Sequence, residues 1–187
     1  MGREKKLRSN FVRLFTGFAL DYPVRRNLEL LLEHLRPLAP LAWSPAANFH
    51  VTTKFIGSFP EERLDELKEE LAKVPKPGRI ELRVEGLGWF DNPHNPRAFF
   101  AAVRANEALA EFKRNLDGAS PEGRPYVPHV TLARVREKVD LGPLRRAIAE
   151  LPSAEFGISL PVKHLLYRSE ATEKGSEYKV IGEFEIG

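Results

Sequence analysis

The stretch His50-Val51-Thr52-Thr53-Lys54-Phe55 decides the fold, because the chain carries its pattern a second time at His129-Val130-Thr131-Leu132-Ala133-Arg134. In each copy a histidine is followed two residues later by a threonine, within a run of β-prone residues. Residues i and i+2 of a strand point to the same face, roughly 6.6 Å apart at about 3.3 Å per residue. We therefore expect each histidine to share a strand face with its threonine, and the two pairs to face one another around one small anion.

The order of predicted elements around the two copies also repeats. In the first half, apolar spacing predicts strand, helix, histidine strand, helix and strand over residues 11–20, 21–36, 50–57, 58–74 and 80–85. In the second half the same order covers residues 98–103, 105–116, 126–135, 141–151 and 156–160, with further strands at 162–168 and 178–186. We interpret the repeat as an internal duplication. The predicted fold is α+β and bilobal, with two antiparallel sheets facing each other across a central cleft and helices outside.

The repeat predicts a single bilobal domain over residues 1–187, with lobe one at about 10–92 and lobe two at about 97–187. An exchange of strands between the lobes is an open alternative. Two local features are also expected. Asp21 stands where a side chain caps the first helix, and the turn-forming residues of 91–96 predict a loop at the midpoint.

Composition excludes several classes of protein. The chain has no cysteine, so disulfides, thiolate metal sites and cysteine nucleophiles are excluded. No apolar run approaches the roughly 20 residues of a membrane span. The basic N-terminus is not followed by the apolar segment of a signal peptide, so a cytoplasmic protein with no membrane association is expected. The net charge of +3 suits a phosphate-bearing partner but is weak evidence for one.

Two histidines beside a phosphate can serve as general base and general acid. Threonine hydroxyls can donate to the non-bridging oxygens, where charge builds in the transition state. One histidine-X-threonine triplet is more simply a strand histidine bonded to a neighbour, but two copies at matched places are harder to explain in that way. Neither motif contains an acidic residue, so no metal and no cofactor is expected. The other histidines, His34, His94 and His164, are interpreted as structural.

The residues resemble a known family, the RNA 2′,3′-cyclic phosphodiesterases of bacteria and archaea, also called 2′-5′ RNA ligases, of the two-histidine phosphoesterase superfamily. The resemblance covers nearly the whole chain. Its segments are Val12-Arg13-Leu14-Phe15 with Phe18-Ala19-Leu20, residues 48–57, residues 128–134, and a tail with Leu165, Ser169, Gly175, Tyr178 and Phe184. Thr53 stands where the family has leucine, and it should face away from the cleft.

The resemblance implies hydrolysis of 2′,3′-cyclic phosphates at RNA ends to 2′-phosphates, with His50 as acid and His129 as base. It also implies a reversible 2′-5′ ligation. RNA with a cyclic phosphate end is the expected partner, tRNA fragments being one candidate, and the protein is expected to be a monomer. Two alternatives stay open: a phosphodiesterase acting on small cyclic nucleotides or 2′-5′ oligonucleotides, and a non-catalytic RNA-binding module.

Thr52, Thr131, Lys54 and Arg134 are the predicted substrate-binding residues. Strand alternation places Lys54 on the cleft face, although a solvated lysine is an equally good interpretation. Alternation places Arg134 on the wrong face unless the strand bulges, whereas the resemblance implies that this arginine contacts the phosphate. Aromatic side chains that could stack on a base are those of Phe55, Trp89, Phe90, Tyr126 and Tyr167, and none of them is assigned.

Overall fold

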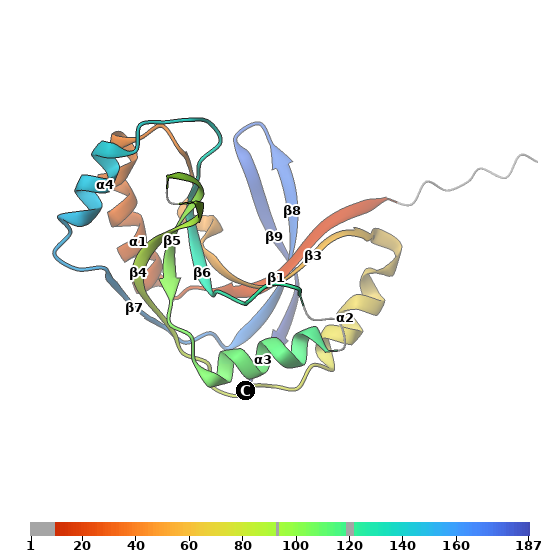
Figure 1. The fold of residues 1–187 in the computed structure, drawn as a ribbon. Helices are drawn as coiled ribbons and strands as arrows, with labels where there is room; N and C mark the ends of the chain where they lie inside the picture. The colour runs from red at the N-terminus through yellow and green to blue at the C-terminus, as the bar shows by residue number, and fades with distance from the viewer. Residues whose placement is uncertain (1–9, 93, 119–121) are drawn as a thin grey trace, which may run out of the picture.

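The computed structural model describes residues 10–92, 94–118 and 122–187, which fold into two antiparallel sheets (Figure 1). The four-stranded sheet has the order β3-β1-β8-β9, formed by His50–Pro60, Phe11–Ala19, Lys163–Thr172 and Gly175–Glu185. The five-stranded sheet has the order β2-β6-β5-β4-β7, formed by Ala42–Trp43, His129–Arg134, Asn95–Val103, Leu82–Asn92 and Glu155–Ser159. The predicted α+β class with two antiparallel sheets is confirmed, and each histidine strand lies in a different sheet.

The described residues form four α-helices outside the sheets, each with one apolar face turned to the interior. Their bounds are Tyr22–Leu35 for α1, Leu64–Ala72 for α2, Glu107–Asp117 for α3 and Gly142–Ala149 for α4. Helix α1 packs against β7 of the five-stranded sheet, and α3 packs against β3 of the four-stranded sheet. Each of these helices therefore covers the sheet that holds the histidine strand of the other half.

Strands are exchanged between the halves in the same reciprocal way. Strand β4 follows α2 in the first half but pairs with β5, and β8 belongs to the second half but pairs with β1 (Figure 1). The sheets therefore do not divide at the midpoint, and the limits 10–92 and 97–187 describe the sequence repeat and not the two sheets. A single cluster of buried apolar side chains runs through both sheets, including Phe18 and Phe99.

Gly17 permits the close approach of β1 to the first histidine strand. A Cβ at this position would lie 2.6 Å from the backbone oxygen of Val51, a distance that no side chain tolerates. A glycine in a strand often marks such an approach of two backbones. The position of the first motif therefore depends on a residue without a side chain in the neighbouring strand.

Local details differ from the sequence-based expectations at three places. Asp21 precedes α1 but does not cap it: its carboxylate accepts from the backbone N–H of Leu160 at 2.7 Å and so ties α1 to the end of β7. Where a loop was expected at 91–96, strand β4 continues to Asn92 and β5 begins at Asn95, and these two residues are paired; Pro93 lies outside the described residues. The predicted helix from residue 58 begins only at Leu64, because β3 continues to Pro60 alongside β1.

Candidate active site

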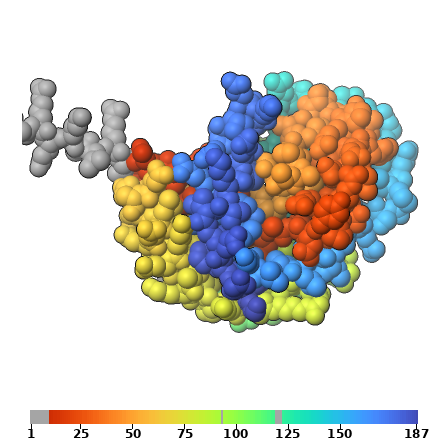
Figure 2. Space-filling view, turned by 180° about the vertical axis from the view of Figure 1, so that it is seen from behind, coloured from red at the N-terminus to blue at the C-terminus, as the bar shows by residue number. Residues whose placement is uncertain are grey.

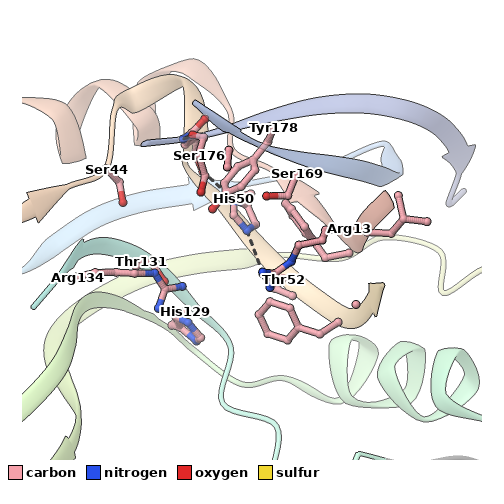
Figure 3. A pocket seen from close by; sticks show the side chains of 16 residues that line it. Arg13, Ser44, His50, Thr52, His129, Thr131, Arg134, Ser169, Ser176 and Tyr178 are labelled. Carbon is pink, nitrogen blue, oxygen red and sulfur yellow. Dashed lines mark hydrogen bonds between the residues drawn. The ribbon is translucent and has the colours of Figure 1, made fainter. Parts of the chain in front are cut away.

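A cavity of about 600 Å³ lies where the two histidine strands face one another (Figure 3). This volume is within the range of small-molecule sites. His50 and Thr52 enter the cavity from β3, and His129 and Thr131 enter it from β6. The other lining residues come mainly from β1, β8 and β9: Arg13, Leu14, Phe15, Ser44, Asn48, Phe55, Gly57, Arg134, Ser169, Ala171, Ser176 and Tyr178.

Both histidine strands bulge at the residue after the motif threonine. On β3, Thr52 and Lys54 lie opposite consecutive residues of β1, so Thr53 is the extra residue. On β6, Thr131 and Ala133 lie opposite consecutive residues of β5, so Leu132 is the extra residue. A bulge reverses the alternation of side chains beyond it. The two copies are therefore alike in their backbone irregularity as well as in their sequence.

The bulges decide which of the predicted cations reaches the cavity. Arg134 lines the cavity, because the reversed alternation returns it to the face of His129. Lys54 does not line it. Its amine donates to the carbonyl of Leu116 at 3.3 Å and lies 3.7 Å from a carboxylate oxygen of Asp117, both on α3. The expectation that Lys54 shares the cleft face was wrong, because it assumed a regular strand.

The two imidazoles are held in the same way. Nδ1 of His50 donates to the carbonyl oxygen of Asn48, and Nδ1 of His129 donates to the carbonyl oxygen of Val127, each at 2.7 Å. A carbonyl can only accept, so the neutral rings carry their proton on Nδ1 and leave Nε2 with a lone pair. Nε2 of His50 is hydrogen-bonded to the hydroxyl of Thr52 at 3.0 Å. This tautomer suits a group that accepts a proton through Nε2.

Burial against aromatic rings lowers the pKa of both histidines. The ring of His50 lies 4.8 Å from that of Phe15 and 5.2 Å from that of Tyr178, and its pKa falls to about 4. Repulsion from His129, when that ring is protonated, and from the charge of Arg134 lowers the pKa of His50 further. Burial also lowers the pKa of His129, which meets the ring of Phe90 edge-on at 4.5 Å. Both rings are therefore neutral at pH 7 in the empty site.

The electrostatics of the cavity favour an anion. Arg13 and Arg134 both line it, and no described lining residue carries a carboxylate. Arg13 was not predicted as a site residue, although it is the only charged residue in the apolar run 11–19. A lone charged residue in an apolar strand was therefore the signal that sequence reasoning missed.

Further polar residues of the cavity were not predicted either, namely Ser44, Asn48, Ser169, Ser176 and Tyr178. Asn48 has two structural roles. Its carbonyl holds His50, and its side-chain amide donates to the carbonyl of Ser176 at 2.7 Å, joining the first motif to the start of β9. Strand β9 is distant in the sequence, so no local pattern indicates this contact.

Of the five aromatic candidates, only Phe55 lines the cavity, and 65% of its surface is exposed. Phe90 packs behind His129, and Tyr126 donates its hydroxyl to the carbonyl of Thr52 at 2.9 Å. The other two pack on aromatic neighbours: Tyr167 stacks on Phe15, and Trp89 packs against Phe99. Because Phe55 follows the bulge as Arg134 does, the two occupy equivalent positions in the two copies.

The remaining histidines lie outside the cavity, as expected. His34 is on α1 and His94 is in the β4–β5 hairpin. His164 is 2% exposed, and its Nε2 is hydrogen-bonded to the hydroxyl of Thr53 at 2.8 Å. That hydroxyl also bonds to Thr16 at 2.7 Å, so Thr53 does face away from the cleft. Across residues 10–92, 94–118 and 122–187 no group of three or more His, Asp or Glu side chains could hold a metal ion.

Two sheets that present paired histidine and threonine side chains to one anion-favouring cavity define a two-histidine phosphoesterase class of protein. The chain belongs to the LigT-like phosphoesterase family, whose profile matches residues 19–100 and 102–174. Within the described part of the chain, no helix is long and apolar enough to cross a membrane.

The sequence similarity to named relatives extends over most of the chain. An RNA 2′,3′-cyclic phosphodiesterase of Thermus thermophilus is 32% identical over 94% of this chain and 90% of its own length. A protein of the same name from Methanothermobacter thermautotrophicus is 30% identical over 89% of this chain and 95% of its own length. A crystal structure of a Thermus thermophilus protein, 27% identical, matches with a TM-score of 0.74 over 93% of this chain and 97% of that one. The apo structure of Escherichia coli LigT, 20% identical, shares the fold with a TM-score of 0.75 over 95% of this chain and 99% of its own.

Proposed function

We propose that the protein hydrolyses the 2′,3′-cyclic phosphate at an RNA end to a 2′-phosphomonoester, with His50 and His129 as the acid–base pair. The observation that carries this proposal is the arrangement of both histidines, each held through Nδ1, around one cavity that no described carboxylate lines. The names of the relatives support the choice of substrate.

In the proposed reaction His129 accepts a proton from water through Nε2 as the water oxygen forms a bond to phosphorus. The bond from phosphorus to O3′ breaks, and His50 gives its Nε2 proton to that oxygen. The direction of these two roles follows the family resemblance. The product carries the phosphate on O2′ and a free 3′-hydroxyl. The reaction balances with one water and needs no other reactant.

Arg134 and the hydroxyls of Thr52 and Thr131 would donate to the non-bridging oxygens, where negative charge increases. The acid must be protonated when the step begins, yet burial keeps both rings neutral in the empty site. A bound phosphate anion raises the pKa of a nearby imidazole. Substrate binding would therefore raise the pKa of His50 and increase the fraction of this ring that is protonated when the reaction begins.

The test is incubation with an oligonucleotide ending in a 2′,3′-cyclic phosphate, followed by identification of the product phosphomonoester. His50→Ala and His129→Ala should each lower kcat by on the order of 10²–10⁴, the range for a positioned acid or base. His94→Ala is the matched control, because this histidine is exposed on the β4–β5 hairpin outside the cavity. If the His50→Ala or the His129→Ala protein were folded and kept the turnover of the wild type, the two-histidine mechanism would be refuted.

The proposal includes a second, reversible reaction of the cyclic phosphate, a 2′-5′ ligation in which the 5′-hydroxyl of a second RNA takes the place of water, the bond from phosphorus to O3′ breaks, and the phosphate on O2′ is joined to that 5′-oxygen. His129 would then take the proton of that hydroxyl. A mixture of a cyclic-phosphate RNA and a 5′-hydroxyl RNA should yield a joined product, and both histidine variants should lose joining and hydrolysis together. If either histidine variant still joined the two RNAs, ligation would not use the same pair of histidines as hydrolysis, and this part of the proposal would be wrong.

A further inference from the structure

A second groove, of about 390 Å³, adjoins the cavity at Arg134, which lines both. It runs over the start of β5 and the segment that follows β6. The backbone N–H of Val135 donates to the carbonyl of Arg97 at 2.9 Å and holds the two segments together. Its lining residues are Asn95, Pro96, Arg97, Arg134, Val135, Arg136, Glu137 and Lys138.

The charge of this groove is strongly positive. Arg97, Arg136 and Lys138 add three cations to Arg134, against the single carboxylate of Glu137 among the lining residues. The side chain of Arg97 is 85% exposed, and its Nε lies 3.3 Å from a carboxylate oxygen of Asp91. Such a solvent-exposed ion pair is weak, so it holds Arg97 only weakly. Arg136 and Lys138 are exposed, and neither forms an ion pair with any residue in the described part of the chain.

The opposite side of the cavity does not offer the same charge. There the β8–β9 hairpin forms a ridge whose tip projects from the molecule (Figure 2). Along residues 170–179 it carries the carboxylates of Glu170, Glu173 and Glu177 against two lysines, and Lys179 is paired with Glu170 at 2.6 Å. A polyanion that leaves the cavity is therefore drawn towards Arg134 and away from the hairpin.

We propose that this groove binds the sugar–phosphate backbone of the RNA strand that carries the cyclic end. The terminal phosphate would occupy the cavity, and the phosphates before it would pass Arg134 to reach Arg97, Arg136 and Lys138. The substrate is then an RNA strand and not a free cyclic nucleotide, which could use only the cavity. This inference rests on the proposed function of the cavity.

The test compares two substrates, a single-stranded oligonucleotide ending in a 2′,3′-cyclic phosphate and a 2′,3′-cyclic mononucleotide. The wild type should show the higher kcat/KM on the oligonucleotide. A variant combining Arg97→Gln, Arg136→Gln and Lys138→Gln should lose about tenfold in kcat/KM on the oligonucleotide, mainly through KM, and should keep its kinetics on the mononucleotide. The dependence of log KM on log salt concentration should become shallower by roughly 2, at about 0.7 per lost phosphate contact with a single strand.

A control variant removes the same charge near the start of β4 and the end of β5: Arg79→Gln, Arg83→Gln and Arg104→Gln together. These exposed arginines line a separate groove that shares no residue with the cavity. Equal kcat/KM of the wild type on the two substrates, or equal losses from both triple variants, would overturn the inference.

Binding of a labelled oligonucleotide that already ends in a 2′-phosphate, followed by fluorescence anisotropy, separates this inference from the proposed function. If the wild type hydrolyses neither substrate, the proposed function fails. The groove is then still supported if the first triple variant alone weakens binding, and refuted if it does not.

Discussion

Thr52 and Thr53 are neighbours in one strand, and we predict that the same substitution affects activity at one and stability at the other. The hydroxyl of Thr53 joins two buried polar groups, Thr16 at 2.7 Å and Nε2 of His164 at 2.8 Å. Thr53→Val keeps the shape and removes that hydroxyl. His164 lies among the rings of Phe18 and Phe112 and is 2% exposed, so its ring is shielded from solvent.

A buried polar group left without a partner costs about 1–3 kcal/mol. Thr53→Val should therefore lower the free energy of unfolding by about 2 kcal/mol. In a chain of this size each kcal/mol lowers Tm by about 2–4 °C. Thr53→Ser keeps the hydroxyl and should recover much of the loss. Turnover of Thr53→Val should stay within about twofold of wild type, because its side chain points away from the cavity.

Thr52→Val is the matched control, since the hydroxyl of Thr52 opens into the cavity and, among the residues that the structure describes, bonds only to Nε2 of His50. It should unfold within about 0.5 kcal/mol of wild type, as is usual for a change that leaves no buried group unpaired. Its kcat should fall by about 10–10², less than for loss of a histidine. The assays are urea unfolding and hydrolysis of a cyclic-phosphate oligonucleotide. Wild-type stability of Thr53→Val, or equal losses of activity from the two variants, would refute this reasoning.

Three further predictions concern charge, pH and metal ions. Arg134→Gln should lower kcat/KM by about 10²-fold, the loss typical of one donor to transition-state charge, whereas Lys54→Gln should leave it within about twofold because Lys54 contacts α3; steady-state kinetics would contradict this if the two losses were equal. Burial lowers the pKa of His50 and of His164 to about 4, so between pH 6.5 and pH 4 the unfolded chain binds protons that the folded chain does not. The free energy of unfolding should therefore fall as the pH drops from 6.5 to 4, by roughly 3 kcal/mol for each of the two histidines. His164→Phe should remove the part of this loss that is due to His164, as measured by urea unfolding at pH 6.5 and at pH 4. Because the pKa values of His50 and His129 are both lowered, the optimum of kcat/KM should lie below pH 6.5. The value of kcat/KM should decline at lower and at higher pH, and each limb reports the coupled pair of histidines and not one residue. A kcat/KM that keeps rising to pH 8 would contradict this prediction. Excess chelator should leave hydrolysis unchanged, and a loss restored by a divalent ion would show that the reaction needs a metal.

The sequence by itself predicted the fold class, most of the elements and the two histidines and two threonines that the structure brings to one cavity. The pattern of His50 and Thr52, repeated at His129 and Thr131, is local, and strand alternation over two residues depends only on backbone geometry. Helix α1 and strand β6 follow from apolar spacing in the same way. Each of these predictions uses residues that are close in the chain.

Tertiary structure decided the rest, because it depends on pairing between distant strands. The register of β1 with β3 and of β5 with β6 creates the bulges that send Lys54 to α3 and Arg134 to the cavity. No local pattern marks a bulge, since its extra residue is defined only by the partner strand. Strands β8 and β9 are far in the sequence from β1 and β3, yet they belong to the same four-stranded sheet. They bring Ser176 and Tyr178 to the cavity beside His50. Burial beside such distant residues sets the pKa of the imidazole, so the protonation of the site is a property of the packed structure and not of the motif.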